Sequence, residues 1–513
     1  MRTKKLILNS GVSLLLQMVT VICGFILPRL MLQAFGSEVN GAVSSITQFL
    51  GYITLLEAGV GGVTRAALYK PLASGDMDKV NGIINSTKRF FRSLSLIFIV
   101  YAVMLSVSFK YISGTSLDFL FIAALVLIIS GANFSQYCFG MTYSIVLQAD
   151  QSYYIVNTIQ ILTVIFNTVV SVVMIKLGCG IHAIKLINVC AYLFKPSIIY
   201  LVCKKRYKLD KKTKNDYTSI KQRWNGFGHH IAYYIHNNVD IMIATIILGL
   251  KSVSVYSIYF MIVAGIKNVV NVISGSSEAT FGNMIAKDEK ELLENRFTML
   301  ENLTSIIITV FFVVTGMLIF DFIEIYTTGI NDTEYILYPF GILLVVSEAL
   351  HSLKQNYHSL VLAAGHYKET QKGAFVEAGM NLFLSVICAL TFGLEGIVLA
   401  TIISTVYRMI DYVIYLKKNI IQRPVTVFIK RMVVNVGCVI ISVFISLLIP
   451  FAKPQTYFDW VLKAIPIFMI TFIITVGFNF VMYKDSTIQI CLKLISLVKK
   501  GKENLSDHHK TNL

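Results

Sequence analysis

The sequence predicts an all-α protein that crosses a membrane many times. Hydrophobic residues make up 55% of its 513 residues, and the mean hydropathy is +0.69. Charged residues account for only 14%, against about 25% in an average soluble domain. Fourteen apolar runs follow one another along the chain, each long enough to span a bilayer as a helix of about 20 residues. These observations exclude a soluble globular protein.

The predicted helices follow from these runs in chain order. The first run begins at Leu6, directly after a basic N-terminus, and continues for nearly thirty residues. Because the apolar core of a signal peptide has only roughly 7–15 residues, we expect an uncleaved first helix. The predicted membrane spans are 6–33, 40–64, 90–110, 118–142, 153–176, 180–203, 226–249, 252–277, 298–324, 335–362, 370–391, 395–416, 432–451 and 459–482.

The formal charge of +17 lies mostly in the segments between these helices. With the N-terminus in the cytoplasm, the inner segments hold 34 of the 45 Lys and Arg residues and the outer loops hold four. This bias places both termini inside by the positive-inside rule. We therefore expect a multi-pass protein of the plasma membrane, and the positive charge does not imply a nucleic-acid partner.

An internal repeat divides the predicted helices into two sets of six. At one constant offset, Gly180 to Lys205 matches Gly393 to Lys418, and Phe35-Gly36 matches Leu248-Gly249. Chance matches would scatter over many offsets, so we predict two parallel repeats followed by an added helix pair. Parallel repeats are a transporter's architecture, with the substrate site between the halves.

The repeat sets the predicted domain boundaries. The predicted parts are an N-lobe (1–203), a basic cytoplasmic linker (204–225), a C-lobe (226–416), the added pair (432–482) and a cytoplasmic tail (483–513). The eight cysteines are scattered and show no C-x-x-C spacing, so neither a disulfide framework nor a zinc site is indicated. The sequence contains no P-loop, and no segment outside the membrane is long enough for an enzyme domain, so we expect a transporter without a metal or catalytic residues.

Seven cations lie at least four residues inside the ends of the predicted spans. Such charges are costly and indicate functional sites by default. We expect Arg29, Lys195, Lys267 and Arg408 to line a cavity; the alternative for each is a pair with a neighbouring acid. Lys185 and Lys463 lie near outer helix ends, where we expect them to extend to the membrane surface; the remaining cation is Lys354.

The acids that lie equally far inside the predicted spans are fewer. Glu57 stands among three glycines in Leu55-Leu-Glu-Ala-Gly-Val-Gly-Gly62, and we interpret it as a cavity acid, with a structural ion pair as an equal alternative. Asp240, Asn381 and Thr405 fall at comparable depths and offer oxygen ligands. We expect them to hold a coupling cation, either Na⁺ or H⁺, and no other cofactor.

The N-terminal part of the sequence resembles a known family. Gly24-Phe-Ile-Leu-Pro-Arg-Leu-Met-Leu-Gln-Ala-Phe-Gly36, Asn40-Gly-Ala-Val-Ser-Ser-Ile-Thr-Gln-Phe-Leu50 and the segment from Leu55 to Leu72 are similar to the start of Wzx-type polysaccharide repeat-unit flippases. These belong to the multidrug/oligosaccharidyl-lipid/polysaccharide exporter superfamily, whose fold is MATE-like.

The resemblance implies a substrate and a site. The implied substrate is an undecaprenyl-pyrophosphate-linked oligosaccharide, which is turned from the inner to the outer leaflet for capsular or other surface polysaccharide synthesis. In related lipid II flippases, cavity arginines on the first, second and eighth helices meet the pyrophosphate. Arg29 stands at the matching place on the first helix, Lys267 lies on the eighth, and the second carries only Arg65 at its inner end. A polysaccharide polymerase is an implied partner, and we expect a monomer in contact with membrane lipid.

Four alternatives remain open at this point. A multidrug or organic-cation exporter of the same superfamily would need a cavity that attracts cations. A lipid II flippase would share the pyrophosphate but not the sugars. A membrane-bound glycosyltransferase or polymerase would need a long acidic outer loop, and the predicted outer loops are short. A scaffold for capsule assembly would not need charges inside the membrane.

Overall fold

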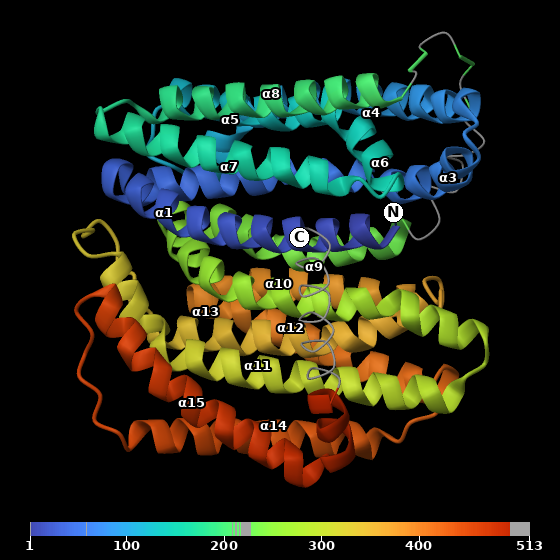
Figure 1. Ribbon diagram of the computed structural model, residues 1–513. Helices are drawn as coiled ribbons and strands as arrows, with labels where there is room; N and C mark the ends of the chain where they lie inside the picture. Colours follow the sequence, from blue (N-terminus) through green and yellow to red (C-terminus); the bar gives the residue numbers. More distant parts are fainter. Residues whose placement is uncertain are drawn as a thin grey trace, which may run out of the picture. The chain divides into compact units, whose positions relative to one another are not determined.

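The computed structural model describes residues 2–57, 59–207, 209–210, 213–214, 216 and 227–492, which form helices joined by turns and loops. The basic linker and the tail fall largely outside these residues. The helices (Figure 1) are α1 (Arg2–Gly51), α2 (Thr54–Glu57), α3 (Val60–Ser74), α4 (Met77–Ser113), α5 (Phe119–Ser135), the π-helix η1 (Gln136–Gly140), α6 (Met141–Ala149), α7 (Tyr153–Lys176), α8 (Ile181–Arg206), α9 (Phe227–Ile243), the π-helix η3 (Ala244–Leu248), α10 (Leu250–Ala286), α11 (Lys290–Tyr326), α12 (Tyr338–Ala363), α13 (Gln371–Asn419), α14 (Val425–Leu447) and α15 (Tyr457–Met482).

The predicted all-α membrane fold is confirmed. Within the described residues, eleven helices are long and apolar enough to cross a membrane. Two of them, α1 and α13, each run through the boundary between two predicted spans and leave helical geometry only at Gly36 and Gly393. The predicted span 335–362 corresponds to α12, whose bounds are Tyr338–Ala363.

One turn of the backbone repeats at the offset found in the sequence. Gly36 has φ 78° and ψ 175°, and Gly249, its counterpart in the second repeat, has φ 81° and ψ 174°. This region of backbone space is open almost only to glycine. The same turn therefore joins the first two helices of each repeat.

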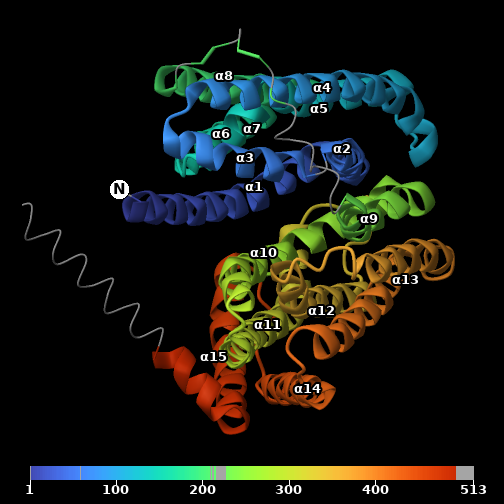
Figure 2. The same cartoon turned by 90° about the vertical axis from the view of Figure 1, so that its right-hand side faces the viewer.

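The chain divides into two compact units, which are described separately. Unit 1 contains Met1–Met261, Gly329–Glu334 and Leu382–Ile397, and unit 2 contains Ile262–Thr328, Tyr335–Asn381 and Val398–Leu513. In unit 1, α1 packs along α7, and α8 packs on α5 and α7. In unit 2, α11 is surrounded by α12, α14 and α15 (Figure 2). The predicted domain boundaries come from the sequence repeat and not from these two units, and they stay a prediction.

Close backbone packing fixes the second half of α1 within unit 1. A Cβ atom on Gly41 would stand 1.8 Å from the carbonyl oxygen of Leu250, so only glycine fits at this crossing. Next to it, Asn40 Nδ2 donates to Ser254 Oγ at 2.8 Å. Asp332 accepts from the amide and the hydroxyl of Ser37 at 2.7 and 2.5 Å. These contacts hold the turn at the end of the first predicted span in one geometry.

Candidate functional site

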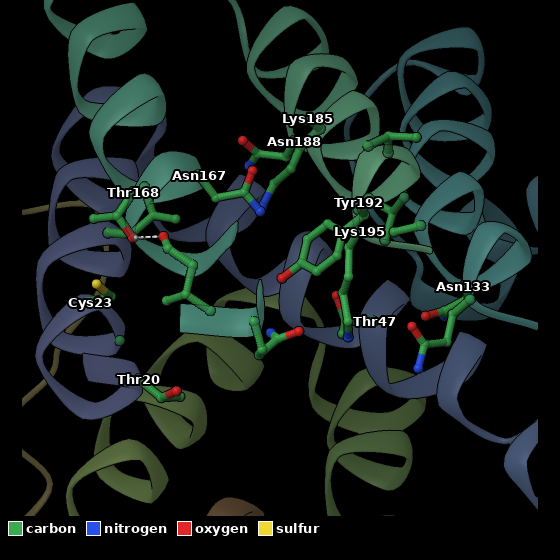
Figure 3. A pocket seen from close by; sticks show the side chains of 18 of the residues that line it. Thr20, Cys23, Thr47, Asn133, Asn167, Thr168, Lys185, Asn188, Tyr192 and Lys195 are labelled. Carbon is green, nitrogen blue, oxygen red and sulfur yellow. Dashed lines mark hydrogen bonds between the residues drawn. The ribbon is translucent and has the colours of Figure 1, made fainter. Parts of the chain in front are cut away.

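A cavity of about 650 Å³ opens between helices of unit 1 (Figure 3). Its walls come from α1, α5 with η1, α7 and α8. It is lined by Thr20, Cys23, Gly24, Leu27, Pro28, Thr47, Ile129, Ala132, Asn133, Gln136, Gln160, Val164, Asn167, Thr168, Lys185, Asn188, Val189, Tyr192 and Lys195. On α1, α5–η1, α7 and α8 these residues recur at steps of three and four, so each helix presents one face to the cavity.

Gly24 and Pro28 form a notch in the α1 wall. A Cβ atom added to Gly24 would meet nothing within 4 Å. Pro28 has no N–H, so the carbonyl four residues earlier, that of Gly24, lacks its helical hydrogen bond. Helix α1 nevertheless continues through Pro28 in helical geometry. The notch therefore offers the cavity an open space and a backbone carbonyl that lacks its helical N–H partner.

Two lysines of α8 give the cavity its charge. Lys185 and Lys195 are half-buried, and neither has an ion-pair or hydrogen-bond partner among the described residues. No aspartate or glutamate belongs to the described residues that line the cavity. Ammonium groups without counter-charges attract anions strongly in a low-dielectric site. The cavity is therefore suited to an anionic ligand.

Five carboxamide side chains, namely Asn133, Gln136, Gln160, Asn167 and Asn188, add to the polar lining, together with the hydroxyls of three threonines and of Tyr192. Gln160 Oε1 and Asn167 Oδ1 are buried and accept no hydrogen bond in the structure. A buried acceptor without a donor costs about 1–3 kcal/mol, so these oxygens point to a ligand with hydroxyl or amide donors. Each carboxamide both donates and accepts, as sugar hydroxyls do.

A second chamber of about 270 Å³ adjoins the first. The two share Gly24, Leu27, Pro28 and Lys185. The second chamber is further lined by Met31, Asn40, Val43, Ser44, Ser257, Ile258 and Met261. Lys185 therefore lies where the two chambers meet. Its sequence position near a helix end predicts instead that its side chain extends to the membrane surface.

The four predicted cavity cations are found in different surroundings. Lys195 lines the large chamber. Arg29 is half-buried next to Pro28 on α1 and is not among the residues that line the two chambers. Lys267 Nζ lies 3.0 Å from Glu348 Oε2 in unit 2. That Arg29, Lys195, Lys267 and Arg408 bind a pyrophosphate stays a prediction.

Arg408 is fully buried inside unit 2 among polar partners. Its Nη1 lies 2.5 Å from Asp411 Oδ2, its Nε lies 3.5 Å from Glu377 Oε2, and its Nη2 donates to the carbonyl of Thr370 at 2.9 Å. Glu377 also pairs with Lys354. Lys267 and Arg408 therefore both have the acid partners that the alternative interpretation predicts.

The structure also shows the surroundings of the predicted cavity acid and of the three predicted coupling residues. Glu57 ends the short helix α2 and is half-buried. Asp240 in unit 1 accepts from the Tyr256 hydroxyl at 3.1 Å. In unit 2, Asn381 Nδ2 donates to Thr401 Oγ1 at 2.8 Å, and Thr405 is buried. The cation site that would combine Asp240, Asn381 and Thr405 stays a prediction.

Unit 2 contains an apolar cavity of about 470 Å³ between α11, α12 and α14. Its lining is apolar apart from Thr309 and Asn435. Asn435 Oδ1 accepts from Ser305 Oγ at 2.6 Å, so its carbonyl oxygen is satisfied inside the protein. This cavity suits a hydrocarbon chain.

No protein-family model matches the sequence, and a comparison with curated proteins gives no match. Solved structures do match. An inward-closed lipid II flippase MurJ has a TM-score of 0.70 at 16% identity, over 93% of this chain and 99% of that chain. An inward-facing multidrug resistance MATE family transporter of the MOP superfamily has a TM-score of 0.62 at 15% identity, over 78% of this chain and 96% of that chain.

The MATE multidrug transporter DinF-BH has a TM-score of 0.60 at 15% identity, over 80% of this chain and 95% of that chain. The chain therefore has the helical fold that these membrane transporters share.

Proposed function

We propose that the protein is a flippase that moves an undecaprenyl-pyrophosphate-linked oligosaccharide from the inner to the outer leaflet, for capsular or other surface polysaccharide synthesis. The observation that carries this proposal is the cavity of unit 1, which combines two unpaired lysines with five carboxamides and no carboxylate among its described lining residues. The fold shared with a lipid II flippase over 93% of the chain supports it.

The pyrophosphate is the part of this substrate that cannot enter hydrocarbon unaided. Lys195 provides a half-buried ammonium with three donors, and no acid competes for it among the described lining residues. Charge-assisted hydrogen bonds to such a group are about twice as strong as neutral ones. We assign Lys195 to the pyrophosphate, with Arg29, Lys267 and Arg408 as further proposed cations on the path.

The sugars and the lipid tail would occupy different surfaces. Sugar hydroxyls match the carboxamides, above all the unsatisfied oxygens of Gln160 and Asn167, and the notch at Gly24 admits a ring close to the backbone. The apolar cavity between α11, α12 and α14 suits part of the polyprenyl tail, which gains about 0.8 kcal/mol for each CH₂ kept from water.

A multidrug exporter is the alternative that the fold also allows. Lipophilic cations would enter a chamber that contains two lysines and no acid among its described lining residues. Like charges in a low-dielectric cavity repel. The cavity of unit 1 therefore favours the flippase over a cation exporter.

Three further parts of the proposal concern the transport cycle. Alternating access would carry the headgroup, driven by a Na⁺ or H⁺ gradient through Asp240, Asn381 and Thr405. The protein would act as a monomer in membrane lipid and deliver its product to a polysaccharide polymerase. Transport that ignores both gradients, together with full activity of Asp240→Asn, would remove the coupling site.

The test is transport in proteoliposomes. A labelled undecaprenyl-pyrophosphate oligosaccharide is offered on one side, and its appearance in the other leaflet is timed for wild type, Lys195→Gln, Arg29→Ala and Lys267→Ala. Losing one charge-assisted bond costs about 1.5–3 kcal/mol, so we expect Lys195→Gln to lower the rate by about 10- to 100-fold. Lys176→Gln is the matched control, because Lys176 is exposed at the end of α7. Wild type that extrudes a lipophilic cation but moves no lipid-linked sugar would favour the exporter.

A further inference from the structure

The two cavity lysines that have no partner among the described residues stand at different depths. Lys185 and Lys195 are ten residues apart on α8, which corresponds to about 15 Å along the helix axis at 1.5 Å per residue. In the view of Figure 3, Lys185 lies with Asn188 on the side of Asn167 of α7, whereas Lys195 extends away from them. The two phosphates of a pyrophosphate share an oxygen, so the group is compact compared with this separation. A pyrophosphate that binds one lysine therefore leaves the other lysine without an anionic partner.

Lys185 is the lysine that the pyrophosphate leaves unpaired. It lies at the junction of the two chambers, which also share the Gly24–Pro28 notch. The smaller chamber adds the polar side chains of Asn40, Ser44 and Ser257 and no acid among its described lining residues. An ammonium removed from water is costly unless an anion meets it. The chamber is thus built for a polar group that carries a negative charge.

We propose that the oligosaccharide contains an acidic sugar, a hexuronic acid or its equivalent, whose carboxylate binds Lys185 while its hydroxyls contact the smaller chamber. This inference rests on the proposed flippase function and narrows its substrate class. A sugar with a free ammonium group is disfavoured, because the described lining offers it no acid.

Discrimination against neutral sugars follows from the same lysine. A neutral residue in the smaller chamber would leave the Lys185 ammonium desolvated and unpaired, and such a penalty against the wrong ligand is an effective source of specificity. Replacing Lys185 by glutamine removes the bond to the carboxylate and the penalty together. The variant should therefore move the acidic substrate more slowly and the neutral one faster, so that the preference disappears.

The test compares two lipid-linked trisaccharides that differ only in the terminal residue, glucuronic acid in one and glucose in the other. Wild type should move the acidic substrate at least about tenfold faster, and Lys185→Arg should keep this preference. Lys185→Gln should bring the two rates within about threefold, whereas Lys195→Gln should slow both substrates by the same factor.

The outcomes separate the two proposals. Equal rates for both substrates in wild type, or an unchanged preference in Lys185→Gln, would overturn the acidic-sugar inference and leave the flippase standing. Wild type that moves neither substrate under any ion gradient would overturn the proposed function itself. Because the wild-type preference is measured without any substitution, the inference is testable even if a variant fails to fold.

Discussion

Filling the notch at Gly24 is a direct test of where the substrate lies. In Gly24→Leu the new side chain would enter open space, since a Cβ atom there meets nothing within 4 Å. Glycine is also less favourable than alanine in a helix by about 0.8–1 kcal/mol. We therefore expect the variant to fold at least as well as wild type.

Transport should nevertheless fall, because Gly24 borders both chambers. Crowding a bound ligand costs about 1–3 kcal/mol by analogy with overpacked cores, and losing access to the Gly24 carbonyl costs about 0.5–1.5 kcal/mol more. The sum corresponds to a rate lower by about ten- to thousandfold. The assay is flipping of the labelled lipid-linked oligosaccharide in proteoliposomes.

Gly11→Leu is the matched control for this substitution. Gly11 lies on the same helix, also faces open space, and does not line either chamber. It should retain wild-type transport. If Gly24→Leu is as active as Gly11→Leu, the substrate does not pass the notch, and the assignment of this cavity is wrong.

Two further predictions concern stability. A Cβ atom on Gly373 would stand 2.0 Å from Arg408 Nη1, so Gly373→Ala should lower the stability of the protein by about 1–3 kcal/mol through overpacking. Gly379→Ala is the control on the same helix and should not lower the stability, because nothing lies within 4 Å of a Cβ atom there. Thermal unfolding in detergent compares the two variants. Burial alone would raise the pKa of Asp332, but hydrogen bonds from Ser37 hold the pKa below its ordinary value. This carboxylate therefore contributes stability above its unfolded pKa of about 3.9, and the contribution is lost as pH falls through the folded pKa. Asp332→Asn should melt lower than wild type at pH 7, and a difference that does not shrink below about pH 4 would contradict this.

The sequence predicts the helices well because length and hydropathy alone distinguish each span. The repeat is also visible in the sequence, and the matching turns at Gly36 and Gly249 agree with its offset. The joins between helices are harder to predict. Only a short polar stretch around Ser37 and Glu38 separates the two halves of α1, and the turn itself depends on the backbone freedom of Gly36.

The sequence predicts the candidate site only in part. Lys195 is conspicuous because a charge inside a span is rare, but the carboxamides and the position of Lys185 escape sequence reasoning. A helix in lipid is apolar on most of its surface, so hydropathy does not reveal which face meets a cavity. The spacing of Gln160, Val164 and Asn167 on α7 is the signal that identifies that wall.

Partners distant in sequence escape prediction for a different reason. Lys267 and Glu348 are 3.0 Å apart although they belong to different helices, α10 and α12, and Arg408 meets Glu377 from the far part of α13. The sequence shows how many charges of each sign the spans contain, but it does not show which of them form ion pairs. Tertiary packing decides which cations stay available to a ligand.

The most direct measurement uses Cys23, which lines the large chamber. A protein in which Cys23 is the only cysteine is treated with a water-soluble maleimide, with and without undecaprenyl-pyrophosphate oligosaccharide, and with undecaprenol as the control lipid. The proposal predicts that the oligosaccharide slows modification of Cys23 several-fold, that undecaprenol does not, and that Lys195→Gln abolishes the protection. Protection by a lipophilic cation instead, with none from the lipid-linked sugar, would contradict the account.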